Sequence, residues 1–136
     1  MRIDPYLMFK GNCEEAFTFY AKLLGGKIEA MLTAEGTPAE EHTPKEWRKK
    51  ILHARLVVGD QVLMASDAPP AHQEAVSGFS VTLDVPTVEE AKRLFDGLSE
   101  GAKITMPLGE TFWAKAFAML TDRFGTPWMI NCAPKT

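Results

Sequence analysis

The sequence predicts an α+β fold made of two tandem βαβββ modules, and three observations predict it. The segment NCEEAFTFYAKLLGG at 12–26 is repeated as TVEEAKRLFDGLSEG at 87–101. Each copy has the apolar spacing of an amphipathic helix. Each copy also follows one strand-like segment and precedes three more. A single domain over 1–136 is therefore expected, with one module at about 1–68 and the second at about 77–136.

The two helices are predicted to begin at side-chain caps and to end at glycine. Asn12 and Thr87 are N-cap residue types, and Glu15 and Glu90 stand three positions later, as in a capping box. Glycines at the ends of both copies are typical of helix C-termini.

Alternation of apolar and polar residues predicts a strand before each helix, IDPYLMF and FSVTLDV. The remaining predicted strands are 27–34, 51–58, 61–66, 102–106, 112–121 and 127–132. Glycine in the turns at 59–60 and 122–126 suits the positive φ of tight hairpins. The polar segment 34–50 is predicted to be a mobile loop or the edge of a dimer interface.

Composition excludes several classes of protein. The chain has 46% hydrophobic and 24% charged residues, a net charge of −3 and a pI near 5.6, so neither a nucleic-acid nor a membrane partner is expected. Cys13 and Cys132 provide no disulfide framework and no cysteine zinc cluster. The N-terminal residues lack the apolar region of a signal peptide, and a cytoplasmic location is expected.

Four motifs extend over most of the chain: PYLMFKGNCEEAFTFYAKLLGG, HARLVVGDQVLMASD, GETFWA and TDRFGTPWMIN. Together they resemble the PhnB-like branch of the vicinal oxygen chelate superfamily, which includes glyoxalase I, bleomycin- and fosfomycin-resistance proteins and extradiol dioxygenases. The resemblance implies a curved mixed sheet around a cavity, and a homodimer. Some relatives carry a methyltransferase label, but neither FKGNCEE nor DVPTVEE offers a glycine-rich nucleotide-binding turn, so that activity is not expected.

In metal-dependent relatives the ligands come from the first and last strands of each module. The resemblance places these positions at Pro5, Met64, Ser80 and Met129. Hard and borderline divalent ions prefer carboxylate or imidazole, and two thioethers with proline and serine make a poor copper(I) site. We therefore expect no bound metal and no cofactor, with both methionines as apolar filling. His42 and His72 are interpreted as surface residues. His53 is discussed below as a candidate acid or base.

Strand alternation separates a helix-facing side from a cavity-facing side. In 51–58, the residues assigned to the helix side are Leu52, Ala54, Leu56 and Val58. In 112–121, they are Ala114, Ala116, Ala118 and Leu120. The opposite side mixes aromatic, methionine and polar residues, which is typical of a small-molecule pocket. The predicted ligand-binding residues are Leu7, Phe9, Arg55, Met64, Ser80, Thr82, Trp113, Lys115, Phe117, Thr121, Met129 and Asn131.

Charged residues on that side leave alternatives open. His53, Arg55 and Lys115 could receive an anionic group, or the two cations could reach solvent or pair with Asp67, Asp84 or Glu110. His53 and Glu110 are the candidate catalytic acid or base residues, against the alternatives of a structural histidine and a solvated hairpin glutamate. The Cys13 thiol, at a helix N-terminus, either has a lowered pKa or is inert.

The leading hypothesis is a homodimer that binds a small, partly apolar, anionic molecule without a tightly bound metal. A metal-dependent lyase, isomerase or dioxygenase using His53 and Glu110 is the first alternative. A non-catalytic structural or interaction module with a solid interior is the second. The sequence does not decide whether a reaction is catalysed; an enzyme would be a glyoxalase-superfamily lyase, isomerase or transferase.

Overall fold

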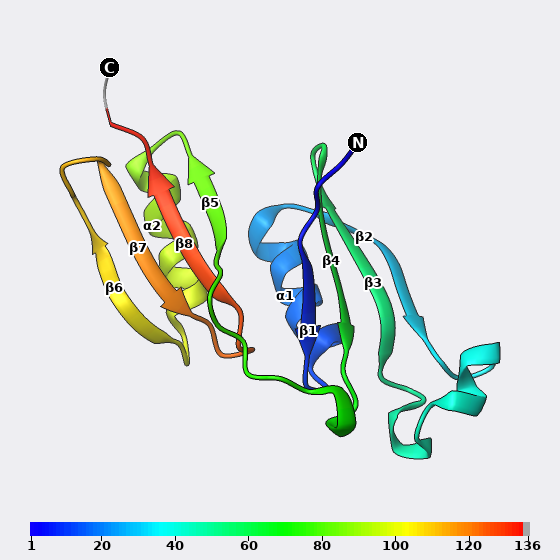
Figure 1. The fold of residues 1–136 in the computed structure, drawn as a ribbon. Coiled ribbons are helices and arrows are strands. Elements are labelled where there is room, and N and C mark those ends of the chain that lie inside the picture. The colour runs from blue at the N-terminus through cyan, green and yellow to red at the C-terminus, as the bar shows by residue number, and fades with distance from the viewer. Residues whose placement is uncertain (135–136) are drawn as a thin grey trace. The chain divides into compact units, whose positions relative to one another are not determined.

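Residues 1–134 are described by a computed structural model in which the strands form two four-stranded sheets, each with one α-helix (Figure 1). The chain divides into two units, Met1–Glu74 and Ala75–Thr136. The predicted α+β fold with tandem βαβββ modules is confirmed. In the described residues, neither α-helix is long and apolar enough to span a bilayer.

The first unit contains β1 (Tyr6–Phe9), α1 (Cys13–Leu24), β2 (Lys27–Thr33), β3 (Ile51–Val58) and β4 (Gln61–Asp67). The strand order is β1-β4-β3-β2, with β1 parallel to β4 and the other neighbours antiparallel. The helix α1 lies against one face of this sheet (Figure 1). The parallel pairing of β1 with β4 is possible because the helix and the β2–β3 hairpin separate these strands along the chain.

The second unit repeats this topology. It contains β5 (Val81–Val85), α2 (Val88–Ser99), β6 (Lys103–Gly109), β7 (Ala116–Thr121) and β8 (Pro127–Cys132). The strand order is β5-β8-β7-β6, again with the first and last strands parallel. The predicted strand 112–121 begins four residues late, because Thr111 holds 112–114 in a turn.

Each sheet buries one face against its own helix. In the first unit, Phe9 packs edge-on against Phe17 of α1 with ring centroids 6.1 Å apart, and both side chains are buried. Leu7 shares this face, because alternate residues of a strand point the same way. The prediction that Leu7 and Phe9 line a ligand site is therefore wrong. Instead, Tyr6 and Met8 lie on the opposite side of β1.

One predicted face is reversed at the start of β3. Ala54 and Leu56 are buried as expected, but Leu52 is exposed and Ile51 is buried. The pairing of β2 with β3 shifts register between Leu32 and Thr33, at this end of the strand. Such a bulge disrupts the two-residue alternation locally.

The two helix N-termini are capped differently. Thr87 caps α2 as predicted, accepting a hydrogen bond from Glu90 N at 3.1 Å. Asn12 makes no side-chain cap on α1, so that prediction is wrong. The buried carboxylate of Asp67, at the end of β4, accepts from Cys13 N at 3.0 Å instead. Both helices are followed by a glycine with positive φ, Gly25 and Gly101, as predicted.

The polar segment between β2 and β3 contains two short 3-10 helices, Pro38–His42 and Lys45–Trp47. Its ends are joined by a backbone hydrogen bond from Glu35 N to Arg48 O of 2.9 Å. Lys50 Nζ donates to Gly11 O at 3.0 Å, connecting the segment to the loop before α1. A third 3-10 turn, Pro70–His72, follows β4.

Candidate ligand-binding site

Each unit has one sheet face that turns away from its helix, which we call its open face, and the candidate site residues are described separately for each unit. In the second unit, the register aligns side chains of adjacent strands into rows across the sheet. Met106 pairs with Met119, which pairs with Met129, which in turn pairs with Thr82. Three thioethers thus lie side by side, and such flexible, polarisable side chains form an adaptable apolar floor.

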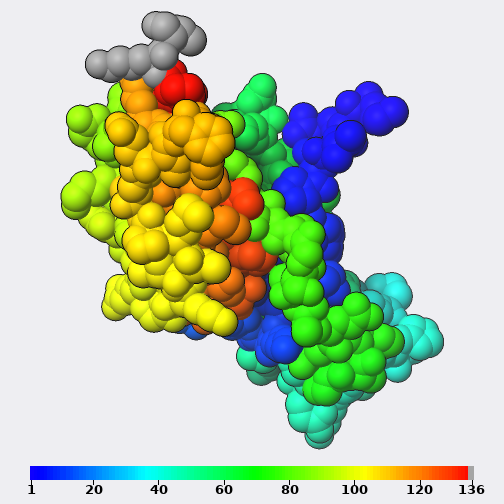
Figure 2. All heavy atoms as spheres, turned by 60° about the vertical axis from the view of Figure 1, so that its left-hand side comes forward, coloured from blue at the N-terminus to red at the C-terminus, as the bar shows by residue number. Residues whose placement is uncertain are grey.

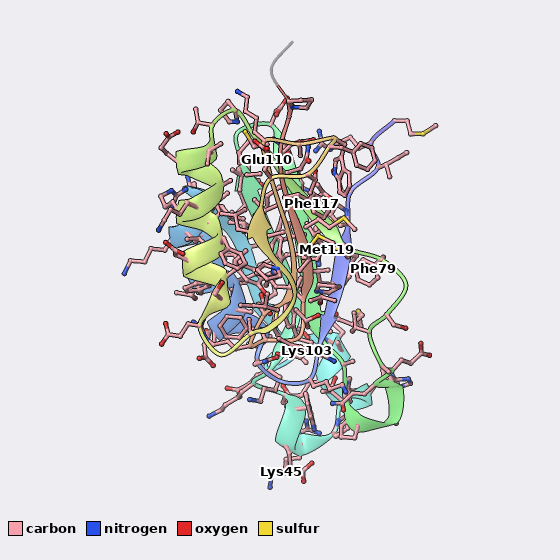
Figure 3. The ribbon with its side chains drawn as sticks, turned by 90° about the vertical axis from the view of Figure 1, so that its left-hand side faces the viewer. Lys45, Phe79, Lys103, Glu110, Phe117 and Met119 are labelled. Carbon is pink, nitrogen blue, oxygen red and sulfur yellow. The ribbon has the colours of Figure 1, made fainter. Side chains whose placement is uncertain are left out.

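The neighbouring row of the same face is aromatic at one end and polar at the other. Phe117 pairs with Asn131, and Asn131 pairs with Asp84. Asn131 Nδ2 donates a hydrogen bond of 2.8 Å to Asp84 Oδ1. In Figure 3, Phe117 and Met119 follow one another down the sheet between the labels of Glu110 and Lys103.

A loop adds two further rings to this aromatic end. Thr111 Oγ1 accepts from Trp113 N at 3.3 Å and from Ala114 N at 3.0 Å. The resulting turn places Trp113 edge-on to Phe117 with ring centroids 5.3 Å apart. Phe112, 95% exposed, packs edge-on to Trp113. In Figure 2 the yellow and orange atoms of β6, β7 and this loop form a continuous surface.

The open face of the first unit carries the polar residues His53 and Arg55. Tyr6 Oη lies 3.1 Å from His53 Nδ1, which is within hydrogen-bonding distance. The rings of the two residues are stacked. Arg55 lies in register with Met64 on β4. Its Nε donates to Glu29 Oε1 at 3.0 Å, so the carboxylate that pairs with Arg55 is one that the sequence analysis did not name.

The other predicted site residues are placed as follows. Thr82, Phe117, Thr121, Met129 and Asn131 lie on the open face of the second unit, and Trp113 lies at its aromatic end. Lys115 is half-buried, just before β7, and its backbone N donates to Cys132 O. Ser80 is half-buried before β5, and Glu110 is exposed after β6. His42 and His72 are both exposed.

The side chains at the metal-ligand positions that the resemblance implies do not match a hard or borderline metal ion. In residues 1–134, no group of three or more His, Cys, Asp or Glu side chains converges in a way that could hold a metal. Met64 and Met129 present thioethers, and Ser66 Oγ, beside Met64, donates to Met8 Sδ at 3.5 Å. Divalent zinc, manganese or magnesium requires imidazole, thiolate or carboxylate ligands, which this donor set does not supply.

Three carboxylates make contacts that the sequence did not indicate. Asp67 accepts backbone hydrogen bonds around the α1 N-terminus, and Asp122 Oδ2 accepts from the Trp128 indole at 2.8 Å. Asp84 is exposed on the open face beside Asn131. Asp84 alternates with the apolar residues of FSVTLDV, but its partner on β8 is visible only from the strand register.

Cys13 is inert rather than activated. Burial raises the pKa of its thiol to about 12, with smaller contributions from the carboxylates of Asp67 and Glu14. The thiolate is the reactive form, so at neutral pH this thiol is protonated and shielded. The suggestion of a lowered pKa at the helix N-terminus is wrong, because burial outweighs the helix dipole here.

The raised pKa of Cys13 predicts a pH dependence of stability. Above about pH 9 the unfolded thiol ionises while the folded one stays protonated up to about 12, so the stability gained from Cys13 declines with rising pH across that window. The difference in unfolding free energy between the wild type and Cys13→Ala should therefore shrink from pH 8.5 upward, as measured by urea denaturation. A constant difference would contradict the raised pKa.

Comparisons with known proteins assign the family. Protein YjdN of Escherichia coli is 39% identical over 142 residues, covering 96% of this chain and 95% of the relative. The crystal structure of protein PA1353 from Pseudomonas aeruginosa is 51% identical with a TM-score of 0.90 and 99% coverage of both chains. The PhnB protein of Bacillus cereus, whose name proposes a 3-demethylubiquinone-9 3-methyltransferase, is 26% identical with a TM-score of 0.80, covering 98% of this chain and 100% of that one.

A family model matches nearly the whole chain, over residues 2–130. The match includes both helices, strands β1 to β7 and the first four residues of β8. This chain belongs to the glyoxalase/bleomycin resistance protein/dioxygenase superfamily, with PhnB-like structural neighbours.

Proposed function

We propose that this chain, as a homodimer, binds a small, partly apolar molecule with an anionic group, without a tightly bound metal ion. The observation that carries the proposal is the open face of the second unit. There a row of three methionines lies beside the aromatic pair Trp113 and Phe117, with Thr82 and Asn131 as sparse polar groups. Apolar area gives affinity in such sites, and a few polar groups fix orientation.

Each unit offers its own basic residues for the anionic group: His53 and Arg55 on the open face of the first unit, and Lys115 just before β7 in the second unit. Arg55 is only partly exposed and is paired with Glu29, so a ligand anion must compete with this carboxylate. An exposed ion pair of this kind is weak, and a ligand carboxylate or sulfonate can replace it at low cost. The guanidinium also offers a second donor edge for a bidentate contact.

The metal-free part of the proposal is supported by the chemistry of the donors. The resemblance implies last-strand ligand positions at Met64 and Met129, and apolar filling is the usual role of methionine at a binding surface. Binding or sequestration of the ligand requires no metal. A methyltransferase activity is not proposed, since the chain offers no glycine-rich turn for a nucleotide-like cofactor.

Two naphthalene probes test the proposal. 8-Anilino-1-naphthalenesulfonate is anionic, and N-phenyl-1-naphthylamine is its uncharged analogue. Fluorescence titration should show saturable binding of both, with Trp113→Ala weakening each probe about tenfold through lost apolar contact. Arg55→Ala should weaken only the sulfonate, about fivefold, because it removes one charged partner.

Arg93→Ala is the matched control, because Arg93 lies on α2 and pairs with Glu90 away from the open face. It should leave both probes unchanged. Saturable binding that survives both Trp113→Ala and Arg55→Ala would overturn the proposed site. The absence of saturable binding would favour a structural or interaction module instead.

A second candidate function is a metal-dependent lyase, isomerase or dioxygenase using His53 and Glu110. The hydrogen-bonded pair of Tyr6 and His53 favours it, because a phenol partner orients an imidazole for proton transfer. Stoichiometric Mn, Fe, Ni or Zn in protein purified without chelator, together with an activity lost in His53→Ala, would replace the first proposal with this one.

A further inference from the structure

We propose that the open face of the second unit holds a subsite for an organic ammonium or amidinium group, between Asp84 and the aromatic pair Phe117 and Trp113. This inference deepens the proposed function and rests on it, since it assigns a positively charged group to the same ligand. It depends on the hydrogen bond, the strand register and the ring contact described below, all within one unit.

The polar end of the row presents hydrogen-bond acceptors. A carboxylate without its proton only accepts, so the atom of Asn131 that lies 2.8 Å from Asp84 Oδ1 must be the amide nitrogen. This fixes the amide orientation and leaves Asn131 Oδ1 as an acceptor next to Asp84. Two side chains on adjacent strands therefore offer oxygen acceptors to a ligand that brings N–H donors.

Asp84 is available to such a ligand. It is exposed, and within residues 1–134 it forms no salt bridge with Arg, Lys or His. By contrast, Glu29, Glu90 and Asp96 each pair with Arg or Lys. Asn131 is a neutral partner and does not compensate the charge of the carboxylate. A ligand cation would supply the missing positive charge.

The aromatic end is placed to receive the same cation or its substituents. Phe117 is in register with Asn131, and Asn131 with Asp84, so Phe117 and Asp84 lie two strand spacings apart, about 10 Å. The Trp113 ring stands edge-on to the Phe117 ring, so the faces of the two rings point in different directions. Ring faces attract ammonium and guanidinium groups, most strongly at tryptophan.

The methionine row limits the rest of the ligand. The row of Met106, Met119 and Met129 is the next row on the same face. Met119 and Met129 lie two residues from Phe117 and Asn131 along their strands. Their thioethers favour contact with an apolar or aromatic body. The class of ligand that matches is an amine or amidine attached to a flat apolar group that spans about two strands and also carries the anionic group of the proposed function.

A matched pair of probes tests this inference on the full chain. 1-Naphthylmethylammonium carries the proposed group, and 1-naphthalenemethanol replaces it with an uncharged hydroxyl. By isothermal titration calorimetry the ammonium should bind about fivefold more tightly than the alcohol, as one exposed ion pair with a cation–π contact provides. Asp84→Asn should abolish this preference and leave the affinity for the alcohol unchanged.

Asp96→Asn is the control, since it makes the same change at an exposed aspartate of α2 that pairs with Lys92. It should leave the preference intact. Equal affinities in the wild type, or a preference that persists in Asp84→Asn, would overturn the subsite. If 8-anilino-1-naphthalenesulfonate still binds through Trp113 in that case, the proposed function stands without it; if no probe binds, both are wrong.

Discussion

Replacement of Asp67 by alanine is expected to lower the free energy of unfolding by about 4 kcal/mol, since several buried N–H groups lose their acceptor at once. One carboxylate oxygen accepts from Gly11 N at 2.9 Å and Cys13 N at 3.0 Å, and the other accepts from Ile51 N at 2.9 Å. Asp67 thus joins the start of α1 to the start of β3. Its negative charge also lies at the helix N-terminus, where it is favoured.

Urea denaturation followed by far-ultraviolet circular dichroism measures this effect. Asp67→Asn should cost less than Asp67→Ala, because the amide keeps one carbonyl acceptor while its NH₂ group faces a donor. Asp60→Ala is the control at an exposed hairpin position and should change the unfolding free energy by less than about 0.5 kcal/mol. A similar small effect at Asp67 would show that its three hydrogen bonds are replaced by water.

The contrast between the two helix caps shows what sequence alone can predict. Thr87 caps α2 through a contact three residues away, so the local motif was sufficient. The acceptor for Cys13 N is 54 residues away, in a different strand, and no local pattern near Asn12 indicates it. The repeat predicted both helices correctly because helix periodicity is also local.

The faces of the strands follow the same division. Asn131 and Thr82 lie on the predicted side because β8 and β5 are paired without interruption. Leu52 is on the opposite side from its prediction, because the register shift between β2 and β3 depends on the partner strand. Phe9 was assigned to the ligand side because it alternates in step with Pro5, a ligand position that the resemblance implies. Its ring instead packs on Phe17.

The chemistry of the predicted site depends on contacts that the sequence does not indicate. The sequence indicated an aromatic and methionine-rich wall that included Met129, and the strand register places Met119 and Met106 in the same row. It could not indicate that Asp84 pairs with Asn131, or that Arg55 pairs with Glu29, because both contacts join strands through side-chain conformations. Charge assignments of the ligand therefore depend on structure rather than on motif.

Replacement of Trp128 by alanine is expected to cost about 4 kcal/mol of unfolding free energy, as for other large buried aromatic side chains. Trp128, on β8, is 1% exposed and belongs to the core. Its indole N–H donates to Asp122 Oδ2 at 2.8 Å, while Asp122 Oδ1 accepts from Phe124 N and Thr126 N. The residue therefore ties the hairpin turn between β7 and β8 to the core.

Trp128→Phe separates the two contributions, because it keeps most of the buried ring and removes the indole donor. Its expected cost is about 2 kcal/mol, the penalty of leaving a buried carboxylate with one fewer hydrogen bond. Trp113→Ala is the matched tryptophan variant: Trp113 is 42% exposed, so stability should change by less than about 1 kcal/mol while probe binding weakens. A Trp113→Ala protein as unstable as Trp128→Ala would instead place Trp113 in the core and remove it from the ligand site.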